Sequence, residues 1–434
     1  MEGKIVVAID VGSYKIVSVI VRIDDSINVL GVSEVKSAGI RKGQIVDIED
    51  AVNAINTSLE AAERMAGYSA SHVVVSIGGS QIESQNSRGV VAVANQNGEI
   101  TENDLARVID AARAISMPST REIIHVLPRN YIVDGQEGIK DPIGMSGVRL
   151  EVDTHIISAN SISVRNLEKA VSEVGVDITN FVFNGYASSQ SVLTDTEKEL
   201  GVILIDIGAA TTDISIYTEG SISYSSVLAI GARHITNDLA IGLRISLESA
   251  EKIKLYLSHL ANKKTRQVQV EDVVPEGRKK ERPSDDIDLS SLNLPEELRM
   301  VSQKTLIEGI IRPRLNEIFT MIGLEIKKSG FGGQTPAGIV ITGGGALTVG
   351  VKESAKRILA MPVRTGGPNN IKGIIDEVQS PAFAAVIGLT LSTSGGESAG
   401  GKGLNLGNFK VGLSIGGSTK LVKKIFSLIK SFMP

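Results

Sequence analysis

The chain has 434 residues, too many for a single hydrophobic core, and its composition (42% hydrophobic, 22% charged) is that of a globular protein with two or more domains. Its net charge is −4, its aromatic content is 3%, and it contains neither Trp nor Cys. These values exclude disulfides and thiolate metal sites, fit a reducing cytoplasm, and argue against nucleic-acid binding, which uses basic surfaces and stacked aromatic rings.

The first predicted element is a pair of strands, 4–9 and 15–22, joined by a turn that contains Asp10, Gly12 and Ser13. An apolar run that ends in Asp-x-Gly and then resumes predicts a buried β-hairpin. Backbone N–H groups and the Ser13 hydroxyl can bind an anion in such a turn. Asp10 cannot, but it fits a divalent cation lying between the protein and a phosphate chain.

A mixed sheet covered by helices is expected to follow. The pattern predicts a third strand over 27–35, a helix over 48–66 and a further strand over 72–77. Residues 83–157 are large enough for a small inserted domain. Its predicted elements are a strand at 89–94, a helix at 101–114, and strands near 123–133 and 148–157.

The hairpin pattern then occurs a second time, 196 residues further along, with Asp206, Gly208, Thr211 and Thr212 in the corresponding segment 202–216. Two hairpins, each with one carboxylate, predict a duplicated domain that clamps a metal–nucleotide between its halves. The alternative for each copy alone is an ordinary glycine turn between core strands.

Two later segments add to this prediction. A strand over 339–342 runs into Gly343, Gly344 and Gly345 and then into a helix over 351–359, and glycines without side chains leave room for a flat purine or ribose. Glu251 and Lys254 lie three apart on a helix and therefore on one face, where they can hold ribose hydroxyls and cover the base. A solvated surface ion pair is the alternative for these two residues.

The C-terminal part predicts a tethered helix. Residues 263–298 are charged and contain three prolines, which indicates a flexible insertion, and 392–418 are rich in Gly and Ser, as in a coil-type linker. Residues 419–433 place an apolar arc beside lysines and contain no acidic residue, which is typical of a membrane-surface helix, although a helix docked on the protein's own core is the alternative. The residues expected to contact the membrane are Lys420, Leu421, Val422, Lys423, Lys424, Ile425, Phe426, Leu428, Ile429, Lys430 and Phe432.

Two phosphate hairpins, a glycine adenosine motif and an inserted domain resemble the actin, Hsp70 and hexokinase superfamily. Segments 73–93, 120–157 and 231–254, together with the tail helix and its linker, resemble the FtsA family of bacterial cell-division proteins. The block 120–157 is specific, because it is not an ATP motif. The resemblance covers nearly the whole chain.

The resemblance implies an α/β fold of two actin-like duplicated domains, each a mixed five-stranded sheet flanked by helices, with an inserted α+β domain, a disordered linker and a C-terminal amphipathic helix. The implied division of the chain is a first subdomain at 1–82, 158–195 and 360–391, an inserted domain at 83–157, a second subdomain at 196–250 and 310–359, a smaller subdomain with a flexible insertion at 251–309, the linker 392–418 and the helix 419–434.

The family's ligands would be ATP and Mg²⁺. The implied site is made of Asp10 and Asp206 holding Mg²⁺ through water; Gly12, Ser13 and Lys15 meeting the β- and γ-phosphates from one side; Gly208, Thr211 and Thr212 meeting them from the other, with Gly231 nearby; Glu251 and Lys254 on the ribose and base; and Gly343, Gly344 and Gly345 on the adenosine. Asp213 matches the position that orients the attacking water in actin, where the residue is His, so at most a weak ATPase is expected.

The resemblance also implies partners and a location. FtsA-like proteins form filaments and tether the tubulin-like FtsZ to the cytoplasmic face of the membrane at the division site. The FtsZ C-terminal tail is expected on the second half, near 250–320, anionic lipid on the tail helix, and other division proteins on 83–157. Nucleic acid is not expected.

Three other functions fit parts of the pattern. A pilus-assembly adaptor would share the fold and the position of the inserted domain, but not the tail or the 120–157 block. A small-molecule kinase would need an acid placed to deprotonate its acceptor, and no isolated Asp in a glycine-rich loop clearly serves. An Hsp70-type chaperone would need a peptide-binding domain after the adenosine motif, where only a linker and one helix remain.

Overall fold

The computed structural model describes residues 3–95, 97–270, 285–296, 298–373 and 376–392. By its contacts the chain divides into two compact units, Met1–Gly400 and Gly401–Pro434. The second unit, which contains the predicted membrane-binding helix 419–434, lies outside the described residues, as does the predicted linker apart from Ser392.

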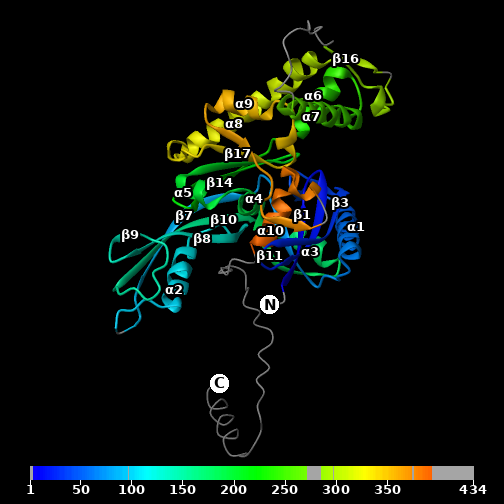
Figure 1. Cartoon of the computed structure of the whole chain (residues 1–434). Coiled ribbons are helices and arrows are strands. Elements are labelled where there is room, and N and C mark those ends of the chain that lie inside the picture. Colours follow the sequence, from blue (N-terminus) through cyan, green and yellow to red (C-terminus); the bar gives the residue numbers. More distant parts are fainter. Residues whose placement is uncertain (1–2, 96, 271–284, 297, 374–375, 393–434) are drawn as a thin grey trace, which may run out of the picture. The chain divides into compact units, whose positions relative to one another are not determined.

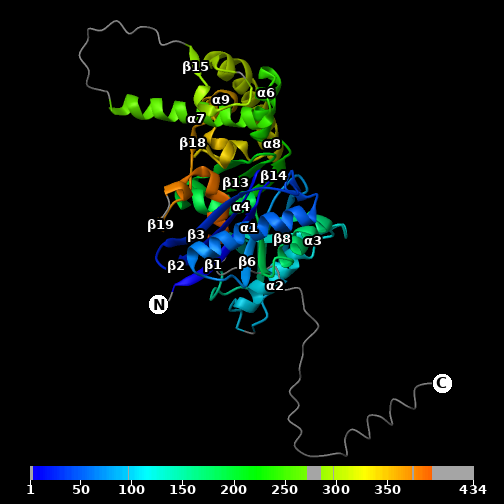
Figure 2. The same ribbon diagram turned by 90° about the vertical axis from the view of Figure 1, so that its right-hand side faces the viewer.

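The first half of the chain forms a mixed sheet (Figures 1 and 2). Its strands in spatial order are β11 (Asp177–Phe183), β6 (His72–Ile77), β1 (Lys4–Val11), β2 (Lys15–Ile23), β3 (Ile27–Lys36) and β19 (Ile371–Gly373). Strands β11, β6 and β1 are parallel, whereas β1, β2 and β3 are antiparallel neighbours. The prediction of a five-stranded sheet is wrong here, because the sheet has a sixth strand, β19, at its edge. The sequence does not reveal β19, since three residues are too few to show an alternating pattern.

Alternation along β1 explains how this sheet is covered on both faces. Val7 and Ile9 face α1 (Ile48–Ala66) and α3 (Ser161–Ser172), whereas Val6 and Ala8 face α4 (Asn184–Val192) and α10 (Ala384–Leu391). Helix α1 begins at Asp47, whose carboxylate accepts the N–H of Asp50, and ends at Gly67 in the left-handed region.

The second half repeats the same arrangement. Its sheet has the order β14 (Ser221–Leu228), β13 (Thr212–Thr218), β12 (Val202–Ile207), β17 (Ile339–Thr342) and β18 (Val363–Thr365). Strands β14, β13 and β12 are antiparallel, and β12, β17 and β18 are parallel, which matches β3, β2, β1, β6 and β11 one for one. The predicted duplication and the five strands of this sheet are confirmed. The helices α6 (Arg233–Leu243), α7 (Leu247–Val270), α8 (Arg312–Ser329) and α9 (Val351–Leu359) share the core of one face of this sheet, and α4 packs on the other face.

The described parts of the predicted flexible insertion 263–298 form helix and strand. Helix α7 continues to Val270, because 263–270 contain neither Gly nor Pro to end it. A short strand β15 (Asp286–Asp288) pairs with β16 (Met300–Ser302), and a π-helical turn (Thr305–Ile311) leads into α8. Residues 271–284 lie outside the described part.

The inserted segment forms its own sheet and core. The strand order is β7 (Glu83–Ala92), β10 (Arg149–Asn160), β8 (Arg121–Val133) and β9 (Gln136–Ile139), and α2 (Glu102–Arg113) packs on it. Strand β9 is absent from the prediction, and β7 begins six residues earlier than predicted because its polar start faces hydroxyl and amide partners instead of a core.

Those partners belong to β14 of the second half. The Ser84 hydroxyl donates to the Ser225 carbonyl at 2.6 Å, and the Asn86 amide donates to the Ser223 carbonyl at 3.2 Å. His155 lies between them, with Nδ1 2.7 Å from Asn86 Oδ1 and Nε2 3.0 Å from Ser225 Oγ. Burial lowers the pKa of His155 to about 3, so the ring bridges the two parts in its neutral form at physiological pH.

Candidate nucleotide site

The two predicted hairpins have the same geometry. The Gly12 N–H donates to the Lys15 carbonyl at 3.1 Å, and the Gly208 N–H donates to the Thr211 carbonyl at 2.9 Å. Asp10 and Asp206 therefore occupy equivalent places, each at the end of the central strand of its sheet. Across the hairpin Asp10 faces Val17, whereas Asp206 faces Asp213, so only the second half carries a second carboxylate.

Each of the paired carboxylates accepts a hydrogen bond from a serine that the sequence did not single out. The Ser76 hydroxyl donates to Asp10 Oδ1 at 2.8 Å and accepts the N–H of Val11 at 2.9 Å. The Ser188 hydroxyl, on α4 of the first half, donates to Asp206 Oδ2 of the second half. Ser76 is detectable as a lone polar residue in the apolar run VVVSI, whereas nothing in the sequence links Ser188 to Asp206.

Asp10, Asp206 and Asp213 influence one another electrostatically. Burial raises the pKa of all three carboxyls, of Asp206 to about 6, and the charges of Asp206 and Asp10 raise the pKa of Asp213 further. Asp213 is 4% exposed, and its Oδ1 has no hydrogen-bond partner among the described residues. The three side chains thus gather negative charge in a place where they have little water to solvate it.

This charge predicts how stability depends on pH. A carboxyl whose pKa is raised binds its proton more tightly in the folded chain than in the unfolded one. Its contribution to the free energy of unfolding is therefore complete below pH 3.8, and it is lost as the pH rises through the raised pKa, which is about 6 for Asp206. Asp213→Asn is therefore expected to raise the free energy of unfolding of the metal-free chain by about 1–3 kcal/mol at pH 8 and by less at pH 5, because the lower pH favours the protonated carboxyl, which has the same shape as the amide. Urea unfolding in EDTA at both pH values measures this. A variant less stable than the parent at pH 8 would contradict it.

The residues fit a divalent cation held partly by other oxygens. The described part contains no cluster of three or more His, Cys, Asp or Glu side chains placed to hold a metal ion. Mg²⁺ usually takes one or two carboxylates and completes its octahedron with water and phosphate oxygens. Two carboxylates that influence one another electrostatically, with the unpaired Oδ1 of Asp213, suit such a cation better than they suit one held by protein ligands alone.

The three glycines after β17 differ in what they allow. Gly343 has φ +80°, and a Cβ there would lie 2.1 Å from Asp206 Oδ1. A Cβ on Gly345 would lie 2.3 Å from Ile207 Cγ2, whereas one on Gly344 would meet no atom within 4 Å. Gly343 and Gly345 are therefore needed to pack this loop against β12, and Gly344 is the glycine that faces open space.

Three other residues that were expected to reach the phosphates have partners within the chain. Lys15 Nζ lies 2.6 Å from Glu34 Oε2 and 4.0 Å from the centroid of the Phe383 ring. The Thr212 hydroxyl is buried and donates to the Ile230 carbonyl at 2.8 Å. The Ser13 hydroxyl accepts the N–H of Gly43 at 2.8 Å and keeps its own proton to donate. Among the described residues, the Thr211 hydroxyl has no hydrogen bond that would compete with a ligand.

Gly231 closes the second hairpin. A Cβ on Gly231 would lie 2.6 Å from the Gly208 carbonyl oxygen, and the following N–H groups of Ala232 and Arg233 donate to the carbonyls of Gly208 and Ala209 at 2.9 and 2.8 Å. The first turn of α6 is thereby fixed on the phosphate turn.

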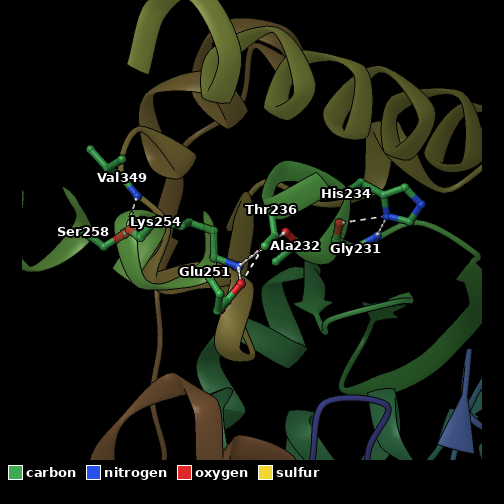
Figure 3. Close-up of polar contacts among 8 residues, drawn as sticks. All are labelled: Gly231, Ala232, His234, Thr236, Glu251, Lys254, Ser258 and Val349. Atoms are coloured by element: carbon green, nitrogen blue, oxygen red, sulfur yellow. Dashed lines mark hydrogen bonds and ion pairs between the residues drawn. The ribbon is translucent and has the colours of Figure 1, made fainter. Parts of the chain in front are cut away.

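Glu251 and Lys254 form a connected pair beside this turn (Figure 3). Lys254 Nζ lies 2.8 Å from Glu251 Oε2 and donates to Thr236 Oγ1 at 2.9 Å, and the Thr236 hydroxyl donates to Glu251 at 2.6 Å. The Lys254 side chain is only 8% exposed, so the alternative of a solvated surface pair is wrong. Thr236, the third member, is absent from the prediction because the register of α6 against α7 cannot be read from the sequence.

Comparisons with known proteins agree with this fold. Residues 79–158 match the model described as "SHS2 domain inserted in FTSA", and residues 203–388 match "Cell division protein FtsA". The cell division protein FtsA of Pseudomonas aeruginosa is 37% identical over 392 residues, which cover 90% of this chain and 89% of that protein.

Solved structures share the fold at low identity. The PilM–PilN type IV pilus biogenesis complex aligns with a TM-score of 0.62 at 14% identity, over 89% of this chain and 98% of the other. MreB5 of Spiroplasma citri bound to ADP aligns with a TM-score of 0.50 at 13% identity, over 90% and 95%. No helix in the described residues is long and apolar enough to cross a membrane. The fold is actin-like, and the extent and identity of the sequence match show that this chain belongs to the FtsA family of cell division proteins.

Proposed function

We propose that this FtsA-family protein binds Mg²⁺·ATP between its two halves, assembles into filaments, and tethers FtsZ to the cytoplasmic face of the membrane at the division site. The observation that carries the nucleotide part is the pair of matched hairpins with half-buried Asp10 and buried Asp206, whose charges act on one another. The ADP bound by MreB5, a protein of the same fold, supports the choice of an adenine nucleotide.

In this proposal, different residues contact different parts of the nucleotide. Backbone N–H groups of the turns at Gly12 and Gly208, with the hydroxyls of Ser13 and Thr211, would hold the phosphates. Asp10 and Asp206 would hold Mg²⁺ through water, and the cation would neutralise phosphate charge. Gly344 would give the adenosine its space, and Glu251 and Lys254, fixed by Thr236, would hold the ribose and base.

Hydrolysis would depend on Asp213. Its free Oδ1 can accept a proton of a water molecule lying between the two halves and so orient that water. Burial and the neighbouring charges raise the pKa of this carboxyl and so favour its protonated form, which is a poor acceptor, so the expected activity is a slow ATPase at most.

The partners follow from the family. FtsA relatives imply cell-division partners in general, and we propose the FtsZ C-terminal tail for the second half, near 250–320, and other division proteins for the inserted domain 83–157. Copies of the chain would form the filament. A filament presents many tail helices to one surface, so that weak individual attachments add up to strong binding.

If the tail helix binds the membrane through its apolar face, a charge added to that face should weaken vesicle binding more than the same charge added to the polar face. Ile425→Glu puts a charge on the apolar arc and is expected to weaken binding to anionic vesicles about 100-fold, because an apolar residue is lost and a carboxylate meets the lipid. Ser427→Glu, the matched control, adds the same charge on the polar face and is expected to weaken binding about fivefold.

Co-sedimentation with vesicles rich in phosphatidylglycerol measures both variants beside the parent and a chain that ends at residue 418. Equal pelleting of the parent and the shortened chain would contradict membrane attachment through this helix. Equal pelleting of the two glutamate variants would contradict binding by one face.

The alternatives have less support. The fold match to the PilM–PilN complex is at 14% identity and shows the fold alone, whereas the match to FtsA relatives extends over about 90% of the chain. No described carboxylate outside the Asp10, Asp206 and Asp213 group is unpaired and buried as a kinase acid would be. ADP production stimulated by a sugar or small acid would favour the kinase.

A further inference from the structure

The short hairpin between β3 and α1 lies on the first phosphate turn. It consists of β4 (Ile40–Arg41) and β5 (Gln44–Ile45), and Gly43 at its tip donates its N–H to Ser13 Oγ at 2.8 Å. A Cβ on Gly43 would lie 2.8 Å from Gly79 Cα, so the tip also packs on the loop after β6. The base of the segment is fixed as well, because the N–H of Ser37 donates to the Tyr14 carbonyl at 2.9 Å.

The duplication gives this hairpin a counterpart. In the second half the segment between the third strand and the following helix carries Gly231, which lies against the turn at Gly208. In the first half the segment in the same topological place carries Gly43, which lies against the turn at Gly12 and Ser13. If one segment borders the nucleotide, the topology puts the other on the opposite side of it.

The tip carries two positive charges that the described chain does not neutralise. Arg41 and Lys42 are both exposed, and within the described ranges neither takes part in an ion pair, although many surface cations in this chain do. Lys15, the cation expected from the sequence on this side of the site, is instead paired with Glu34 and lies over Phe383. The hairpin tip therefore offers positive charge without an ion-pair partner next to the first phosphate turn.

The bond between Gly43 and Ser13 also directs the Ser13 hydroxyl. An oxygen that accepts the Gly43 N–H has its own proton free to donate in another direction, and a donor that is itself an acceptor is strengthened by the chain of bonds. The tip thus orients a hydroxyl that belongs to the phosphate turn.

We propose that the tip Arg41–Lys42–Gly43 is part of the nucleotide site and recognises the terminal phosphate of a nucleoside triphosphate. Arg41 and Lys42 supply positive charge to that phosphate, and Gly43 positions Ser13 to donate to it. This inference rests on the nucleotide site proposed above. It adds that the tip distinguishes a triphosphate from a diphosphate.

The test compares ATP and ADP affinities of the full chain by calorimetric titration in Mg²⁺. Arg41→Gln and Lys42→Gln are each expected to weaken ATP binding about fivefold, and the double variant about 25-fold, while ADP binding changes less than about twofold. Lys327→Gln is the matched control, because Lys327 is exposed at the end of α8 in the other half and has no ion pair in the described structure. It is expected to change neither affinity.

A second measurement needs no variant. Trypsin cleaves after Arg41 and Lys42, and saturating Mg²⁺·ATP is expected to slow that cleavage more than Mg²⁺·ADP does. A double variant with the parent's ATP affinity, equal losses for ATP and ADP, or tip cleavage that ATP does not slow would each overturn the role of the tip. A parent chain that binds neither nucleotide would instead overturn the nucleotide site itself.

Discussion

Gly343→Ala is expected to destabilise the chain by about 3 kcal/mol and to abolish nucleotide binding. The added Cβ would lie 2.1 Å from Asp206 Oδ1 and 2.7 Å from the Ile207 carbonyl oxygen, and φ at this position is +80°, which an alanine rarely adopts. Asp206 cannot simply move aside, because its other oxygen accepts the Ser188 hydroxyl. The substitution therefore strains the loop and displaces a proposed cation ligand together.

Gly344→Ala is the matched control for this prediction. A Cβ at Gly344 would meet no atom within 4 Å, so unfolding free energy is expected to stay within about 0.5 kcal/mol of the parent's. The open space is where the adenosine is proposed to lie, so the same methyl group is expected to weaken ATP binding. Urea unfolding measures the effect on stability, and ATP titration measures the effect on nucleotide binding. Equal stability of the two variants would contradict the close packing of Gly343 on Asp206.

Lys254→Met is expected to destabilise the chain by about 3 kcal/mol. Removing one member of a nearly buried ion pair leaves the other charge without compensation. Among the described residues, Glu251, whose side chain is 20% exposed, would keep only the Thr236 hydroxyl as a partner. Lys252→Met, two residues earlier on the same helix, breaks a pair with Glu248 whose side chains are 43% and 80% exposed, and is expected to cost under about 0.5 kcal/mol.

A double variant tests whether the cost comes from the unpaired charge. Glu251→Leu together with Lys254→Met replaces both charges by apolar groups and is expected to recover most of the stability lost in Lys254→Met alone. It is also expected to bind ATP more weakly than the parent, because both proposed ribose and base contacts are gone. A double variant that is less stable than Lys254→Met would contradict this explanation.

The fold could be predicted well where the sequence carries a strong local pattern. The strands of both hairpins, helix 48–66 and the strand at 72–77 follow from apolar periods, glycine turns and caps, and the repeat of Asp-x-Gly predicted the duplication. Strands β9 and β19 escaped prediction, because four and three residues carry no usable period. The polar start of β7 escaped because its partners, Ser223 and Ser225, are more than 130 residues away.

The sequence predicted which residue types make up the candidate site, but not the orientations of their side chains. Spacing placed Asp10 and Asp206 in equivalent turns, but it could not show that Lys15 points to Glu34 or that the Thr212 hydroxyl is bonded to the Ile230 carbonyl. Contacts between distant elements decide those directions. Ser188, Thr236 and Gly43 are absent from the predicted site for the same reason, because each contacts its partner across an interface between elements.

The most direct test of the account is a calorimetric titration of the full chain with ATP, in Mg²⁺ and in EDTA, beside the double variant Asp10→Asn and Asp206→Asn. Both hairpins are proposed to hold one cation–nucleotide complex, so we predict that the parent binds ATP at least about tenfold more tightly in Mg²⁺ than in EDTA and that the double variant loses this dependence. A parent that does not bind ATP, or a double variant that binds Mg²⁺·ATP as the parent does, would contradict it.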